Sequence, residues 1–237
     1  MRVGLVLGVV VALLSTTAAR ADSPRDMMLE LHGGAFTPGV DDGLGNGNTP
    51  YGDIFGTSMT LLSLHVDYEM WQGFGTLALG GGLGYGWVNG KALSSDGEKT
   101  DDDVGFNIVP LTISLVYRWD WLEVKYGVPF VPYFKAGLSG TIWWATDAKD
   151  DIANTRGPNG EERTGAGLTL GWHVAAGLQF LLDIFSPGMA QQFDEESGVN
   201  NSYIFVEVMH SDVDDFGSDS SIDLSADAVS FGLAFEF

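Results

Sequence analysis

The fold is decided by residues 76–87, which read Thr-Leu-Ala-Leu-Gly-Gly-Gly-Leu-Gly-Tyr-Gly-Trp. Large apolar residues occupy alternate positions of this segment, at Leu77, Leu79, Leu83, Tyr85 and Trp87, with Gly81 as the one gap, and small residues, mostly glycine, lie between them. Successive side chains of a β-strand point to opposite faces, so this strand has one bulky apolar face and one nearly bare face. A face in contact with water would carry Lys, Glu and Thr rather than glycine. The bare face therefore fits the crowded interior of a narrow barrel, and the bulky face fits lipid.

The same alternation recurs along the chain and predicts eight strands. The other seven segments are residues 27–36, 62–70, 109–119, 134–144, 168–182, 203–209 and 229–237. Beyond residue 21 there is no run of ~18 consecutive apolar residues, so we expect no membrane-spanning helix. In hydrocarbon every backbone polar group must be paired, which leaves a closed sheet as the spanning structure. We therefore predict an all-β fold, an eight-stranded antiparallel up-and-down transmembrane β-barrel.

The connections between these segments are alternately long and short. The long ones, at residues 38–57, 89–103, 146–164 and 211–223, are polar and acidic. The shorter ones are a tight turn at 71–74, a link at 120–128 and a link at 184–201, in which Ser186 and Pro187 predict the start of a short helix. Outer-membrane barrels place short turns in the periplasm and long loops outside the cell, so we expect both termini in the periplasm.

Residues 1–21 predict a cleaved signal peptide. Arg2 gives a positive start, residues 3–14 are apolar, and Ala19-Arg20-Ala21 fits the small-x-small cleavage rule. The apolar run is too short to span a membrane, which takes ~20 residues. We therefore expect residues 22–237 to form the barrel and the protein to lie in the outer membrane of a Gram-negative bacterium.

Charge and cysteine content exclude several function classes. The chain carries 32 acidic and 11 basic residues, a formal net charge of −21, and it has no cysteine. Nucleic acid is an improbable partner for such a chain, because phosphate binding needs clustered Lys and Arg. Without cysteine there are no disulfides, thiolate metal sites or cysteine nucleophiles.

The last strand resembles the C-terminal assembly signal of bacterial outer-membrane proteins. Phe231, Leu233, Phe235 and Phe237 alternate and end in a terminal aromatic residue. The resemblance implies that the outer-membrane assembly machinery recognises this strand. More narrowly, the chain resembles a family of uncharacterised outer-membrane β-barrel proteins from myxobacteria and their relatives. The resembling segments are 30–38, 109–112, 116–122, 131–138 and 193–198. That family has no known activity, so the resemblance implies location and fold only.

One strand carries a polar stripe on its inward face. Ser63, His65, Asp67 and Glu69 are spaced two apart, and a hydroxyl, an imidazole and carboxylates are the groups of nucleophilic catalysis. Some eight-stranded outer-membrane barrels are lipid A deacylases with a lipid-facing His-x-Ser pair, whereas this order is reversed and faces the lumen. We therefore favour a buried ion network with no catalytic residue. Its predicted members are Glu30, His65, Asp67, Glu69, Arg118, Lys135 and Glu207.

Metal sites are not predicted at the other histidines. His32, His173 and His210 are isolated in the sequence, and we expect His173 to be a hydrogen-bonded interior residue. The carboxylates of residues 101–103 and 212–215 could hold Ca²⁺ or Mg²⁺. Because no loop has the ligand spacing of an EF-hand, we favour a solvated acidic rim and expect no cofactor.

Taken together, the sequence predicts a monomeric barrel with a packed polar lumen that is not an enzyme. Its expected role is structural or surface-binding through the acidic loops, and its expected partners are outer-membrane lipid, lipopolysaccharide and the outer-membrane assembly machinery. Two alternatives stay open: a narrow channel for small solutes, and a lipid A-modifying enzyme. The inward glycines of residues 80–86 could leave a thin cavity, or could make room for inward Tyr133, Trp143 and Phe205.

Overall fold

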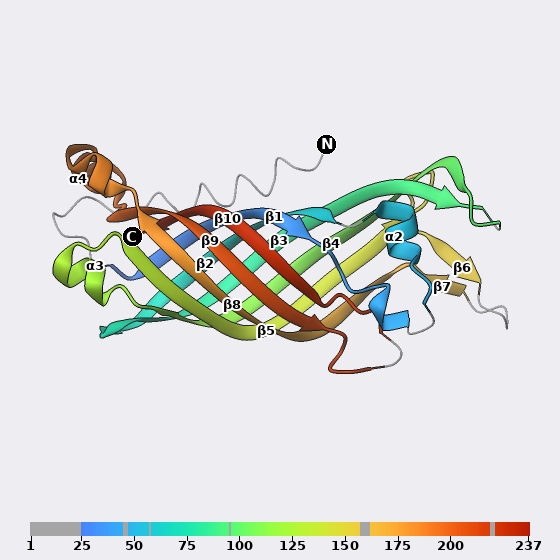
Figure 1. Cartoon of the computed structure of the whole chain (residues 1–237), viewed down its shortest axis with the longest axis horizontal. Coiled ribbons are helices and arrows are strands. Elements are labelled where there is room, and N and C mark those ends of the chain that lie inside the picture. Colours follow the sequence, from blue (N-terminus) through green and yellow to red (C-terminus); the bar gives the residue numbers. More distant parts are fainter. Residues whose placement is uncertain (1–24, 45–46, 57, 95, 157–161, 219–220) are drawn as a thin grey trace.

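The computed structural model describes residues 25–44, 47–56, 58–94, 96–156, 162–218 and 221–237 (Figure 1). The predicted signal peptide at residues 1–21 lies outside these ranges and stays a prediction. Among the described residues, no helix is both long enough and apolar enough to cross a bilayer.

Eight strands form one closed barrel (Figure 1). They are β1 (Met27–Phe36), β2 (Met59–Gly73), β3 (Gly75–Leu93), β4 (Lys99–Arg118), β5 (Phe130–Thr146), β8 (Ala166–Leu181), β9 (Asn201–Val213) and β10 (Ala226–Glu236). Each pairs antiparallel with the next of these strands along the chain. The ring closes where β1 pairs with β10, from Met28 opposite Glu236 to Ala35 opposite Val229. The predicted eight-stranded up-and-down topology is confirmed.

The smaller elements lie at the two ends of the barrel (Figure 1). One end, called the loop end below, carries η1 (Asp42–Leu44), α2 (Pro50–Phe55) and a hairpin of β6 (Asn154–Arg156) and β7 (Glu162–Thr164). The opposite end, called the turn end, carries α3 (Trp121–Tyr126), η2 (Asp183–Phe185) and α4 (Pro187–Ser197). The helix predicted after Ser186 is therefore present, whereas α2 and α3 were not predicted.

The strands are longer than the apolar alternation indicates. β3 and β4 remain paired beyond the apolar segment, with Lys91 opposite Asp103 and Leu93 opposite Lys99. Most of the predicted loop at 89–103 is therefore a strand hairpin, and β9 likewise runs to Val213 inside the predicted loop at 211–223. The predicted loop bounds were wrong here because the strands continue to pair beyond the membrane, where their sequences no longer show the apolar alternation that predicts a strand.

The outer face of the barrel is a belt of exposed apolar side chains. Ile113 is 65% exposed and Leu138 is 63% exposed, values that a water-soluble protein avoids over a continuous surface. Every strand of the barrel contributes to the belt. One member from each, in chain order, is Leu31, Leu62, Leu79, Ile113, Leu138, Leu168, Val208 and Phe231. A closed sheet that satisfies its own backbone and exposes such a belt is a transmembrane barrel.

The inward glycines of β3 make room for side chains of the two neighbouring strands. A Cβ on Gly80 would lie 2.2 Å from the Asp67 carboxylate, and a Cβ on Gly82 would lie 2.4 Å from the Thr112 hydroxyl. The three inward aromatic residues that the sequence analysis considered as neighbours of this run lie against other glycines. Tyr133 lies against Gly177, Trp143 against Gly167 and Phe205 against Gly232. Gly84 and Gly86 leave room in the same way for Pro110, Ile108 and Met59, so the glycine run on β3 accommodates side chains of the adjacent strands rather than those aromatic rings.

An arginine in the middle of the belt should destabilise the barrel. Ile113 is the central residue of the outward apolar stripe of β4, so Ile113→Arg places a charge in hydrocarbon and should lower the free energy of unfolding by about 2–4 kcal/mol. The measurement is urea-induced unfolding in lipid vesicles. Asn89→Arg is the matched control. Asn89 also points outward, from β3, but it lies beyond the apolar stripe of that strand. An equal effect of both variants would contradict the membrane placement of the belt.

Candidate functional site

Two buried cations cross the lumen near the turn end. Arg118 on β4 donates to Glu69 of β2 at 2.7 Å and to Glu236 of β10 at 3.1 Å. Lys135 on β5 donates to Glu30 of β1 and lies 3.3 Å from Glu207 of β9. In the strand order of the ring, β4 lies opposite β10 and β5 lies opposite β1. Each cation therefore joins facing walls of the barrel.

Hydrogen bonds connect the two cations into one network. The Arg118 Nε donates to Gln179 Oε1 at 3.3 Å, and the Gln179 amide donates to Glu30 at 3.4 Å. The Tyr133 hydroxyl donates to Glu207 at 2.9 Å. Arg118 is 1% exposed and Lys135 is 2% exposed. Both charges have lost their hydration, so these hydrogen bonds and ion pairs must replace it.

Five of the seven predicted network residues meet in these contacts, and the other two lie beside them. Asp67 is buried, and its Oδ2 has no hydrogen-bond partner among the described residues. His65 stacks against His32, with ring centroids 4.3 Å apart. Sequence reasoning missed Glu236, Gln179, Tyr133 and His32. The inward parity of the strands marks all four positions, but parity cannot tell which side chains meet across the lumen.

The prediction that His32 is isolated is wrong. Its Nε2 lies 2.9 Å from Glu30 Oε2, and its Nδ1 lies 3.3 Å from the Ser230 hydroxyl. The reason is register, because Glu30 of β1 pairs with His65 of β2 and so brings two distant histidines to one patch of the inner wall.

The other two histidines have local partners. The two ring nitrogens of His173 each lie 2.8 Å from a hydroxyl, one from Ser114 and the other from Ser139. The expectation of a hydrogen-bonded interior His173 is therefore confirmed. His210 is exposed on the outer face and lies 2.7 Å from the Asp227 carboxylate.

A cavity of about 70 Å³ lies on the loop-end side of the ion network. Its polar wall includes His32, His65, Ser63 and Ser230, and its apolar wall includes Phe36, Leu61, Met209 and Leu224. A cavity must offer at least about 10–15 Å³ to hold one water, so this cavity is large enough for water. Ser63 and His65 thus face a cavity inside the barrel rather than lipid.

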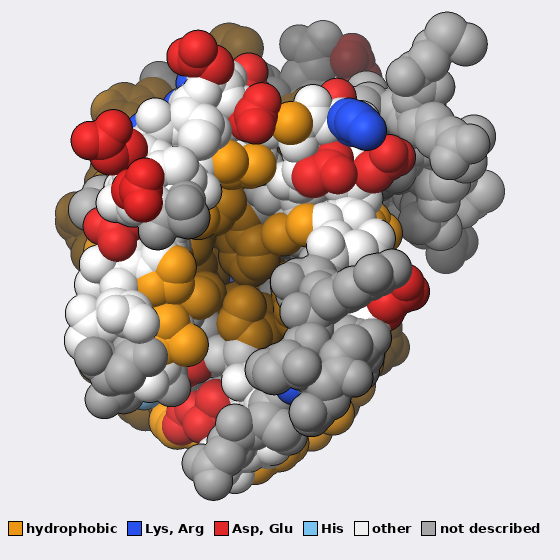
Figure 2. Space-filling view, turned by 90° about the vertical axis from the view of Figure 1, so that its right-hand side faces the viewer, with side chains coloured by type: hydrophobic (Ala, Val, Ile, Leu, Met, Phe, Trp, Pro, Cys, Tyr) orange, Lys and Arg blue, Asp and Glu red, His pale blue; other side chains and the backbone are white. Residues whose placement is uncertain are grey.

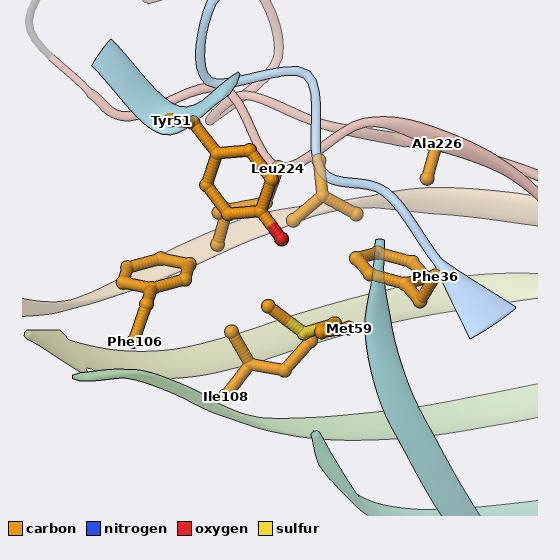
Figure 3. Packing of buried hydrophobic residues seen from close by; sticks show 8 residues of the cluster. Phe36, Tyr51, Met59, Phe106, Ile108, Leu224 and Ala226 are labelled. Carbon is orange, nitrogen blue, oxygen red and sulfur yellow. The ribbon is translucent and has the colours of Figure 1, made fainter. Parts of the chain in front are cut away.

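The loop-end half of the lumen is apolar, which corrects the prediction of a polar lumen throughout. Phe36, Met59, Phe106 and Ile108 point inward there and pack with Tyr51 of α2 (Figure 3). The sequence had placed Tyr133, Trp143 and Phe205 on the inner face but not these four residues, which pack against one another and against α2 in the loop-end half of the barrel. From outside, this end is an apolar hollow with carboxylates around its rim (Figure 2).

Helix α2 is held over the hollow by Asp41. The Asp41 carboxylate accepts the backbone N–H groups of Tyr51 and Gly52, both at 2.8 Å, and so satisfies free donors at the start of the helix. Burial, with the nearby Asp41 charge, raises the pKa of Tyr51 to about 12. Tyr51 therefore stays neutral at physiological pH inside the apolar cluster.

Several carboxylates of the acidic rim bind other groups of the same chain. Asp103 pairs with Lys91 at 2.8 Å, Asp215 accepts the Leu170 N–H at 2.7 Å, and Asp214 accepts the Gly217 N–H at 2.9 Å. Within the described ranges, Glu30, His32 and His65 are the only group of three His or acidic residues with ligand atoms close enough for one metal ion. The solvated acidic rim without a cofactor stays a prediction.

The chain is similar in fold to several solved barrels. No family model and no curated protein matches it. Neisserial surface protein A is 11% identical with a TM-score of 0.47, covering 89% of this chain and 95% of that one. The outer membrane protein OprG from Pseudomonas aeruginosa is 14% identical with a TM-score of 0.48, covering 90% and 96%. Ail, the attachment invasion locus protein of Yersinia pestis, is 13% identical with a TM-score of 0.43, covering 90% and 97%. The fold assignment rests on the chain's own strand pairing.

Removing the lysine of the network should destabilise the barrel. Lys135→Met leaves Glu30 and Glu207 buried without their cation, which should cost about 3–5 kcal/mol of unfolding free energy. Unfolding in vesicles by urea measures the loss. Lys125→Met is the control, because Lys125 is exposed on α3 and should contribute below about 1 kcal/mol. Adding Glu30→Gln and Glu207→Gln to Lys135→Met should recover stability; no recovery would contradict the charge argument.

Glu123 on α3 should make stability depend on pH. Burial, and then the negative charge of Glu236, raise the pKa of Glu123 to about 7, against opposing effects of Arg25 and Arg118. Between pH ~4.5 and ~7 the folded state keeps a proton on Glu123 that the unfolded state releases. The stabilisation from this proton is therefore complete below pH ~4.5 and is lost as pH rises through 7. After allowance for partial solvent screening, the free energy of unfolding of Glu123→Gln should exceed that of wild type by about 1–2 kcal/mol at pH 8, and the two should be equal at pH 4.

The measurement for Glu123 is the difference between wild-type and variant unfolding free energies across this pH range. Glu195→Gln, on the exposed surface of α4, is the control and should show no such trend. A constant difference between wild type and Glu123→Gln would refute the assignment.

Proposed function

We propose that this protein is an integral barrel of a Gram-negative outer membrane with a structural and surface-binding role and no catalytic activity. The observation that carries the proposal is the pair of buried cations, Arg118 and Lys135, each bonded to facing walls of the lumen. Side chains bonded in this way fill the cross-section of an eight-stranded barrel, whose interior is just wide enough for its own side chains. Function then belongs to the outer surface and the loop end.

The orientation follows from where the strands start and finish. β1 begins and β10 ends at the turn end, where the Phe237 carbonyl accepts the Met27 N–H. With short connections placed in the periplasm, the turn end is periplasmic and the loop end faces the outside. The myxobacterial outer-membrane family that the sequence resembles is consistent with this placement.

The exposed loop end supports a binding role. Carboxylates surround an apolar hollow, a surface suited to cationic partners and to divalent ions that bridge it to anionic lipopolysaccharide (Figure 2). Outer-membrane lipid contacts the belt, and the assembly machinery reads the last strand. The chain acts as a monomer, and its closed sheet leaves no edge with which a second chain could pair. No nucleic acid is a partner of so acidic a chain.

A non-catalytic role is supported by the position of the candidate catalytic groups. Ser63 and His65 line the inner cavity, so an acyl chain in the outer leaflet does not reach them through the closed wall. The second candidate function, a narrow channel, draws support from the same cavity and from the hollow at the loop end.

Planar bilayers separate the sealed barrel from the channel. Purified protein should insert without steady current steps, because the bonded side chains of Arg118 and Lys135 leave no continuous water path. Heat-modifiable electrophoretic mobility of protein recovered from the bilayer lipid verifies that it is folded and inserted. Reproducible steps that scale with salt concentration would reject the sealed lumen in favour of the channel.

A further inference from the structure

We propose that Glu30, His32 and His65 form a binding site for one divalent transition-metal ion of the Zn²⁺ type inside the barrel. One ligand atom from each of the three side chains lies within 4.8 Å of the others. Two imidazoles and a carboxylate are a donor set that Zn²⁺ uses with a fourth position open. Ca²⁺ and Mg²⁺ prefer oxygen donors alone, so the histidine pair selects against them.

The backbone holds these ligands in place. Glu30 and His32 alternate along the inward face of β1, and His65 lies on β2 directly opposite Glu30. Bonds of about 2.0–2.2 Å to a tetrahedral ion place ligand atoms about 3.3–3.5 Å apart, and small rotations of the imidazoles close the present separation. His32 Nε2 and Glu30 Oε2 are already 2.9 Å apart.

The charges around the site favour a divalent cation. Glu30, Asp67 and Glu207 provide three carboxylates, and Lys135 is the one ammonium group bonded among them. With neutral imidazoles and ionised carboxylates, these three carboxylates and Lys135 sum to a charge of −2, which is the charge that one divalent ion neutralises. Asp67 is 2% exposed and its Oδ2 has no hydrogen-bond partner among the described residues, so part of this charge has no other local compensation.

Lys135 and the metal can occupy the cluster together. Lys135 is bonded to Glu30 and also lies 3.3 Å from Glu207, so it keeps one carboxylate when Glu30 turns toward the ion. His32 and His65 both line the cavity on the loop-end side. A water molecule in that cavity would complete the coordination sphere.

The test uses protein extracted in detergent without a histidine tag, stripped with a chelator and titrated with Zn²⁺. We expect one bound ion per chain by elemental analysis, and Co²⁺ in its place should give the intense visible absorption of a four-coordinate site. His32→Gln and His65→Gln should each weaken Zn²⁺ binding at least tenfold, because mutating even an outer-shell partner of a ligand costs about 10–100-fold in affinity. The chain has four histidines, so His173→Gln and His210→Gln complete the set as controls and should bind like wild type.

Several results would overturn the site. They are a folded barrel that binds no Zn²⁺ at millimolar concentration, binding that persists in both His32→Gln and His65→Gln, and binding that is lost in His210→Gln. If a variant does not fold, the Co²⁺ spectrum of wild type decides, because weak six-coordinate bands alone would reject ligation by this cluster.

Discussion

The structure depends on pairing every backbone N–H and C=O within a wall that contacts lipid. Pairing of β1 with β10 completes the ring and removes both sheet edges. Once the ring is closed, the alternation of each strand divides all side chains into an outer and an inner set. The apolar belt and the enclosed lumen are therefore two consequences of one closure.

Closure also sets the chemistry of the lumen. Side chains that are distant in sequence face one another across a narrow space from which bulk water is largely excluded. Arg118 and Lys135 are stable there because carboxylates on the opposite walls meet them. The glycines of β3 contribute to the same arrangement, because bare positions beside Asp67 and His65 leave these side chains room to turn inward.

The two halves of the lumen have different roles. Near the turn end, ion pairs and hydrogen bonds join the walls and fill the cross-section. Toward the loop end, a cavity and then an apolar cluster capped by Tyr51 lie beneath an acidic rim. The histidine pair lies at the boundary, where charged groups are still close and water still has access.

The sequence by itself determined the fold class and the face to which each side chain belongs, because a period of two is a local property of a strand. Residues 76–87 and their counterparts were sufficient for eight strands, and parity placed Glu30, Arg118, Lys135 and Glu207 inside. It did not determine where pairing stops, since polar strands such as the start of β4 have no apolar face to mark them.

Only the tertiary structure decided which inward residues meet. Contacts between Lys135 and Glu30, or between Arg118 and Glu236, depend on the register of every strand between them around the ring. The same holds for His32 and His65, which the register of β1 on β2 brings together although each is isolated in the chain. Period and parity are local, whereas contacts across a lumen arise only when the sheet has closed.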